Sequence, residues 1–159
     1  MSEMPYRPKG PPNKLFQAEG GNVAILFALT LPLLIGGVGL GVETSYWYYE
    51  DLKLQSVADS AAYAGGLEYI GGSEEAKVSA VASYSATTNG FDTTTGSIEV
   101  NLPPTSGAYM GEEAVEVILQ RDVPRYFTAI FSDAPVAQTA RAVAYLSFAS
   151  RACLLALST

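Results

Sequence analysis

VAILFALTLPLLIGGVGLGV, residues 23–42, is the stretch that decides the fold of this 159-residue chain. None of its side chains is charged. A helix rises about 1.5 Å per residue, so this stretch would cover roughly 30 Å, the thickness of the hydrocarbon core of a bilayer. Its proline and glycines are better tolerated in membrane helices than in water-soluble ones. The sequence therefore predicts one transmembrane helix over residues 22–42, preceded by a flexible tail rich in proline and glycine over residues 1–21.

Small residues recur at four-residue spacing in the span and beyond it. Gly37 and Gly41 form a G-x-x-x-G pair, a spacing at which two membrane helices can approach closely, although glycines also accumulate in such helices without marking a contact. A nucleotide-binding loop is excluded here because the glycines lie inside an apolar span and follow no strand. The candidate helix-packing positions are Ala24, Ala28, Gly37, Gly41, Ala58, Ala61 and Gly65.

Charge is divided unevenly by the span. Arg7, Lys9 and Lys14 precede it, whereas most of the charged residues after it are acidic. The net charge of the chain is -7. The positive-inside rule then places the tail in the cytoplasm and the rest outside, as in a single-pass protein of the bacterial inner membrane. Such an acidic chain is not expected to bind nucleic acid, because it cannot neutralise a run of phosphates. A cleaved secretion signal is the alternative, but the apolar run is longer than usual for a signal, so we expect a retained anchor.

Polar and aromatic residues follow the span directly. Amphipathic aromatic rings favour the headgroup region of a membrane. A carboxylate at the same depth can reach water, so we expect Glu43 to be solvated, with pairing to a basic partner as the alternative. The candidate membrane-interface residues are Glu43, Tyr46, Trp47, Tyr48 and Tyr49. Since no proline or glycine intervenes before Gly65, the helix is expected to continue over residues 43–70. Its stripe of small residues must pack against this protein's own sheet or against neighbouring copies.

Residues 71–159 predict one small α+β domain in the periplasm. Gly71 and Gly72 end the long helix, and Ser73 as N-cap predicts a second helix over residues 74–87. Alternating apolar and polar residues predict antiparallel strands over residues 97–102 and 114–120 and a third strand over residues 136–148. Pro124 and the aromatic residues after it predict a short helix over residues 123–131. Helices should cover one face of this sheet.

The composition argues against catalysis. The chain has no histidine and only Cys153 as a thiol, so it lacks the usual general base, the usual zinc ligands and any Cys-His or Ser-His pair. We expect no cofactor, no metal and no small-molecule substrate, and a tethered enzyme is the least favoured alternative. Cys153 is expected to form a disulfide with another chain, or else to be a buried thiol. The apolar end of the sequence, residues 154–159, suggests that the chain is part of a longer protein.

The span and the helix after it resemble the Flp/Tad pilus-assembly TadE/TadG-like family, most closely its TadG branch. The resemblance covers residues 20–66, and residues 115–131 and 138–147 are similar to the periplasmic region of that family. It rests on Gly21-Asn22-Val23-Ala24, Phe27-Ala28-Leu29-x-Leu31-Pro32, Glu43 and Leu54-Gln55-x-x-Ala58-Asp59-x-Ala61-Ala62. It implies a membrane-anchored structural component of a tight-adherence pilus apparatus, whose partners are pilus-assembly proteins and possible further copies of itself through the transmembrane helix.

One departure from pilin-like proteins bears on processing. Pilins cut by prepilin peptidase carry a glutamate at the fifth position after the cleaved glycine, and the fifth residue after Gly21 is Leu26. The resemblance therefore favours an uncleaved anchor that keeps residues 1–21. A minor pilin-like subunit whose helix enters a filament core is the second hypothesis.

Overall fold

The computed structural model describes residues 20–145 of the chain, with side chains from residue 23 onward. The chain divides into two compact units, Met1–Gly41 and Val42–Thr159. Cys153 and the other residues after 145 lie outside the described range.

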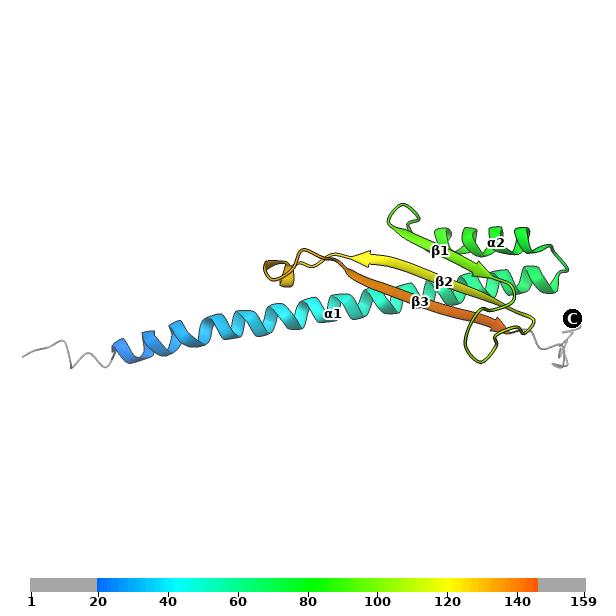
Figure 1. Ribbon diagram of the computed structural model, residues 1–159. Helices are drawn as coiled ribbons and strands as arrows, with labels where there is room; N and C mark the ends of the chain where they lie inside the picture. Colours follow the sequence, from blue (N-terminus) through cyan, green and yellow to red (C-terminus); the bar gives the residue numbers. More distant parts are fainter. Residues whose placement is uncertain (1–19, 146–159) are drawn as a thin grey trace, which may run out of the picture. The chain divides into compact units, whose positions relative to one another are not determined.

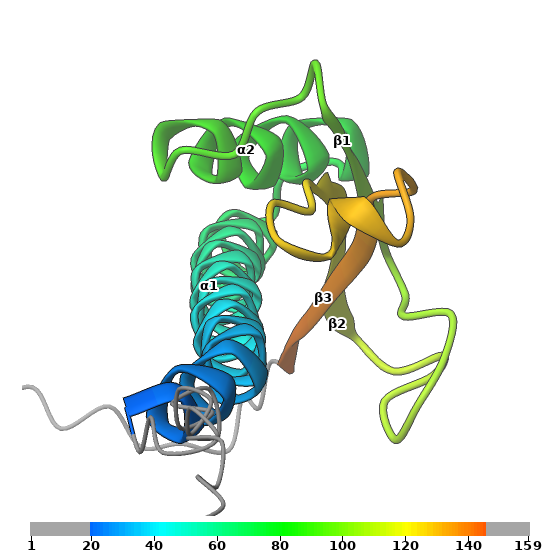
Figure 2. The same cartoon turned by 90° about the vertical axis from the view of Figure 1, so that its left-hand side faces the viewer.

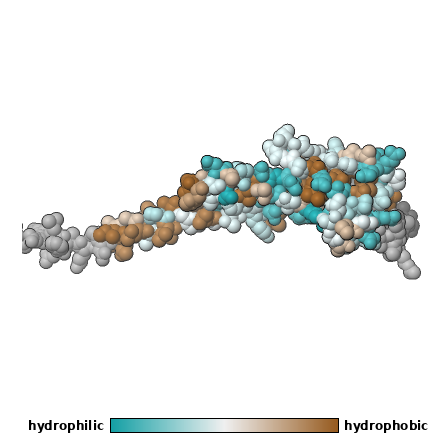
Figure 3. All heavy atoms as spheres, in the orientation of Figure 1, coloured by the Kyte–Doolittle hydropathy of each residue, from teal (hydrophilic) through white to brown (hydrophobic). Residues whose placement is uncertain are grey.

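A single helix, α1 (Gly20–Ile70), begins in the first unit and ends in the second (Figure 1). The prediction that the apolar helix continues well beyond residue 42 is confirmed. Among the described residues, α1 is the one helix long and apolar enough to cross a membrane. Its large apolar side chains between residues 23 and 42 are exposed, and Figure 3 shows this part of the helix mostly in the brown of hydrophobic residues.

The second unit is an α+β domain, as predicted. After α1 come α2 (Glu75–Thr88), β1 (Gly96–Asn101) and β2 (Ala114–Val123), then the short 3-10 helix η2 (Thr128–Ile130) and β3 (Val136–Tyr145). The three strands form an antiparallel sheet in the order β1-β2-β3. Figure 2 shows α2 and the second half of α1 on the same side of this sheet.

The core lies between the helices and that face of the sheet. Alternate residues of β2, Val115, Val117 and Leu119, are fully buried there, in line with the two-residue period of a strand. The small stripe of α1 lets the helix approach closely: a Cβ added at Gly65 would lie 3.1 Å from Val115 Cγ1 and 3.3 Å from Ala82 Cβ. The residues that α1 and α2 contribute to the core are Leu54, Val57, Ala58, Ala61, Ala62, Val78, Ala82 and Ala86.

Two local predictions are wrong. The helix predicted over residues 123–131 shrinks to the three residues of η2, because Val123 still pairs with Val136 in the sheet and the chain between them must turn back into β3. Ser73 does not cap α2, because its hydroxyl donates a hydrogen bond to Glu68; the N-cap is Glu74. The other predicted elements are present with ends shifted by a few residues, and residues 146–148 of the third predicted strand lie outside the described range.

Candidate functional site

A buried carboxylate of α1 holds the loop between β2 and β3. Glu43 is only 3% exposed. Its Oε1 accepts the backbone N–H groups of Tyr126 (2.6 Å) and Phe127 (3.2 Å), and its Oε2 accepts that of Thr128 (2.8 Å). N–H groups at the start of a helical turn have no acceptor within the turn itself. Glu43, which lies on α1, therefore acts as the N-terminal cap of η2.

This geometry corrects the prediction for Glu43, which was solvation or a basic partner. Its carboxylate is buried and, within the part of the chain that the structure describes, is held by main-chain amides and not by a basic side chain. Hydrogen bonds from N–H groups to a carboxylate are charge-assisted and stronger than neutral ones, which offsets the cost of burying the charge.

Further contacts join the next turns of α1 to the same end of the sheet. The indole N–H of Trp47 donates to the carbonyl of Pro124 (3.3 Å), and the Gln138 side-chain amide donates to the carbonyl of Trp47 (2.8 Å). The Arg125 guanidinium lies 5.3 Å from the centroid of the Trp47 ring. One turn further along α1, a largely buried ion pair joins Glu50 to Arg121 (2.7 Å). We call these residues the tether cluster: Glu43, Trp47, Glu50, Arg121, Arg125 and Gln138.

The aromatic residues predicted to form a membrane-interface belt divide into two groups. Tyr46 and Trp47 are half-buried against the loop, and the Tyr46 ring meets that of Tyr126 edge-on at 5.4 Å between centroids. Tyr48 and Tyr49 point outward and are exposed. The position of all four at a membrane surface stays a prediction.

The predicted helix-packing positions also divide. Ala58 and Ala61 are fully buried and Gly65 is buried, all within the core of their own domain. The small residues of this stripe therefore pack against this protein's own sheet and α2. Ala24, Ala28, Gly37 and Gly41 lie in the first unit, where their surfaces are exposed. A contact between those four and another helix stays a prediction.

A second buried carboxylate lies on the sheet face opposite the helices. Glu116 is fully buried and accepts hydrogen bonds from the Asn101 amide (3.0 Å) and from the Thr105 backbone N–H and hydroxyl (3.0 and 2.9 Å). It also forms an ion pair with Arg141, whose Nε lies 2.5 Å from Oε1. Burial raises the pKa of Glu116, but these donors outweigh it and lower the pKa to about 2. This carboxylate stays ionised at neutral pH and fixes the β1–β2 loop to the sheet.

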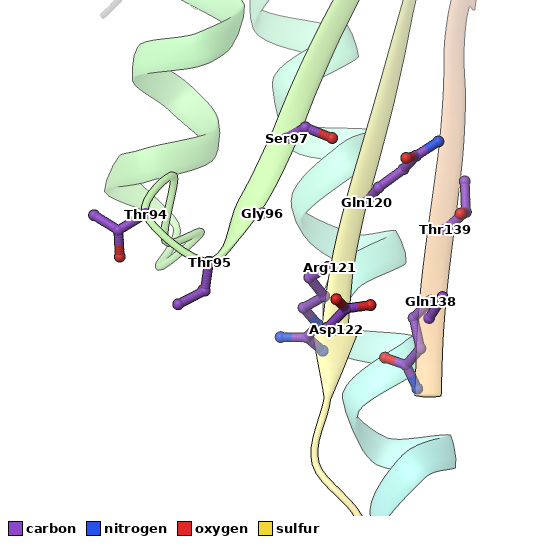
Figure 4. Close-up of a pocket in the computed structure, with 10 residues that line it drawn as sticks. Thr94, Thr95, Gly96, Ser97, Gln120, Arg121, Asp122, Gln138 and Thr139 are labelled. Atoms are coloured by element: carbon purple, nitrogen blue, oxygen red, sulfur yellow. The ribbon is translucent and has the colours of Figure 1, made fainter. Parts of the chain in front are cut away.

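The domain also has an open polar hollow of about 380 Å³ where the strands end near the tether cluster. Figure 4 shows hydroxyl, amide and carboxylate side chains around it, with Arg121 and Asp122 as its charged groups. The lining residues are Thr94, Thr95, Gly96, Ser97, Gln120, Arg121, Asp122, Ala137, Gln138 and Thr139. Between residues 20 and 145, no three histidine, cysteine, aspartate or glutamate side chains gather so that they could hold a metal ion.

Sequence reasoning missed most of the tether cluster. It singled out Glu43 and Trp47 but not Glu50, Arg121, Arg125 or Gln138. One signal was present: the helical turn that the sequence predicts after Pro124 would need acceptors for its first N–H groups, and Glu43 is a carboxylate without an evident partner in the sequence. The Glu43–Tyr126 hydrogen bond joins residues 83 positions apart, so local spacing could not pair them.

Comparison with known proteins relates most of α1 and the turn after it to a protein family. Residues 21–73 match the model of the family described as "Putative Flp pilus-assembly TadE/G-like". No curated protein and no solved structure matches the chain. The matched residues comprise nearly all of α1 and the turn after it, including Glu43, Trp47 and Glu50. The resemblance noted from the sequence is therefore confirmed for residues 21–73, which are similar to the TadE/G-like pilus-assembly family.

Proposed function

We propose that this protein is a membrane-anchored structural component of a Flp/Tad pilus-assembly apparatus. The observation that carries the proposal is the family match over residues 21–73. The apolar first part of α1 supports it, because an exposed run of this length needs a lipid or protein environment. The protein acts by holding other assembly proteins and does not catalyse a reaction.

The proposed anchor lies in the bacterial inner membrane, with the tail in the cytoplasm and the α+β domain in the periplasm. Basic residues of short cytoplasmic segments favour this orientation, and Arg7, Lys9 and Lys14 precede the span. Alkaline phosphatase, which is active only outside the cytoplasm, tests it: a fusion after Thr159 should be active and a fusion before Met1 inactive. The reverse pattern would contradict the orientation.

The tether cluster gives this anchor a mechanical role. Glu43 follows Val42, the last residue of the apolar run, and binds three backbone amides of the β2–β3 loop. Two further turns of α1 are fixed to the sheet through Trp47 and Glu50. The domain is thus attached to the first turns after the proposed membrane segment and does not hang from a free linker, which suits a part that positions partners at a membrane.

Gene deletion tests the function itself. Cells of the source bacterium that lack this gene should lose surface Flp pili in electron micrographs, and the full chain should restore them. A chain in which a cleavable secretion signal replaces residues 1–42 exports the same domain without its anchor and should not restore them. Normal piliation after deletion would contradict a role in assembly, and restoration by the anchorless chain would contradict the need for the anchor.

A further inference from the structure

The β2–β3 loop, residues 124–135, presents large apolar side chains to its surroundings. Tyr126, Ile130 and Phe131 are 66%, 76% and 78% exposed. They lie within six residues of one another, with no charged residue between Tyr126 and Phe131. An exposed group of this kind on a small domain marks a surface that is covered in the working protein.

Several backbone groups of the loop have hydrogen-bond partners within the domain. Glu43 accepts the N–H groups of residues 126–128, and the Thr128 carbonyl accepts those of Phe131 (2.9 Å) and Ser132 (3.2 Å). The Arg125 guanidinium donates to the Ala134 carbonyl (2.7 Å) and the Thr128 hydroxyl (3.2 Å), so it closes the loop across its base. A segment that enters a region poor in water needs its backbone groups paired in this way.

The depth of the loop is set by Glu43. Because Glu43 immediately follows the apolar run and its carboxylate binds the loop directly, the loop lies level with the turn of α1 where that run ends. Aromatic and apolar side chains at this level favour the boundary between headgroups and acyl chains.

We propose that residues 126–131 form a second contact with the membrane, in which Ile130 and Phe131 enter the lipid surface. The ligand is the lipid bilayer itself. The contact rests on the membrane anchoring of the proposed function. This contact adds a second attachment of the chain to the membrane, separate from the apolar run of α1.

Fluorescence quenching on the full chain tests this contact. With Cys153→Ser as background, a single cysteine at Phe131→Cys carries an environment-sensitive dye, and the protein is placed in vesicles of phosphatidylethanolamine and phosphatidylglycerol. Met110→Cys is the matched control, since Met110 is an exposed apolar residue in the loop at the opposite end of β2. Ile35→Cys reports on the anchor. Ile130→Cys provides a second loop position should Phe131→Cys not fold.

The expected result is that brominated lipids quench the loop label and the anchor label, whereas aqueous iodide quenches the Met110 label. The loop label should also emit at shorter wavelength than the Met110 label. The lipid contact would be overturned if iodide quenched the loop label as strongly as the Met110 label. If the anchor label were then still quenched by brominated lipids, the membrane anchoring itself would stand. A loop label shielded from both quenchers would also overturn the lipid contact, because it would indicate that protein covers the loop. If this shielding is lost on dilution, the covering protein is a second copy of the chain. An anchor label outside the lipid would overturn the contact together with the membrane anchoring itself.

Discussion

At the scale of single residues, the domain depends on two buried carboxylates that lie at opposite ends of β2 and do different work. Glu43 joins α1 to the β2–β3 loop, and Glu116 joins the β1–β2 loop to the sheet. Each carboxylate accepts hydrogen bonds from several donors. Removing either one leaves buried donors without acceptors, which lowers the free energy of unfolding by more than the net contribution of the hydrogen bonds themselves.

Replacing Glu43 should loosen the β2–β3 loop. Glu43→Ala removes the acceptor of three backbone N–H groups, and we expect it to lower the free energy of unfolding by on the order of 3 kcal/mol. Hydrogen exchange should accelerate most at the amides of Tyr126, Phe127 and Thr128. Asp51→Ala, which removes an exposed carboxylate from the same helix, is the control and should be nearly neutral. Unchanged exchange at these three amides would show that Glu43 does not hold the loop.

Glu116 should make the domain sensitive to acid. Its pKa falls from 4.5 to about 2 on folding, so its contribution to stability is complete above about pH 4.5 and is lost as the pH falls towards 2. Glu116→Gln should therefore be less stable than the native chain at neutral pH and should lose less stability between about pH 5 and 2, measured by denaturant unfolding. Glu112→Gln, an exposed carboxylate in the β1–β2 loop, should behave like the native chain. Equal acid sensitivity in Glu116→Gln and the native chain would refute this assignment.

At the scale of elements, α1 serves two environments. Its first part exposes its apolar side chains, and its second part buries a stripe of small residues in the core. The two parts should therefore respond differently to enlargement of a small residue.

Ala61 tests the buried stripe. Because Ala61 is fully buried, Ala61→Leu should overpack the core and lower the free energy of unfolding by about 1–3 kcal/mol. Lys53→Leu adds a comparable apolar side chain at an exposed position of α1 and should change stability little. Thermal unfolding of both variants in detergent provides the measurement. An Ala61→Leu protein as stable as the native one would mean that the core does not pack as described.

Gly41 tests the exposed part. Leucine suits lipid better than glycine, so Gly41→Leu should leave the protein in the membrane fraction but weaken its co-purification with pilus-assembly proteins, if helices touch at this position. Val38→Leu, a similar change at an exposed position of the same helix, should preserve co-purification. Equal recovery of partners with both variants would show that no close helix contact exists at Gly41.

The elements were predictable to the extent that their signals are local. The absence of proline and glycine between residues 43 and 64 predicted the continuation of α1, and the alternation in residues 114–120 predicted β2. The prediction failed after Pro124, where local propensity favoured a helix but the chain had to return into β3. The tether cluster was not predictable, because its partners are far apart in the sequence and meet only when the sheet lies against α1. Trp47 and Gln138, for example, are 91 residues apart.

At the scale of the whole molecule, one helix, α1, provides both the apolar run of residues 23–42 and the turns that hold the β2–β3 loop. Under the proposed function, the apolar run of this helix is a membrane anchor. A filament subunit would use the same helix differently, after cleavage before Asn22. The fifth residue after Gly21 is Leu26, where processed pilins carry glutamate, which favours the uncleaved anchor of the proposed function over a filament subunit.

The N-terminus of the mature protein tests this claim most directly. Mass spectrometry of the chain recovered from inner membranes and from sheared pili of the same cells identifies both the fraction that holds the protein and its first residue. We predict recovery from the membrane with residues up to Gly21 retained, apart from loss of the initiator methionine. Recovery from the pili with Asn22 as the first residue would contradict it and identify the protein as a filament subunit.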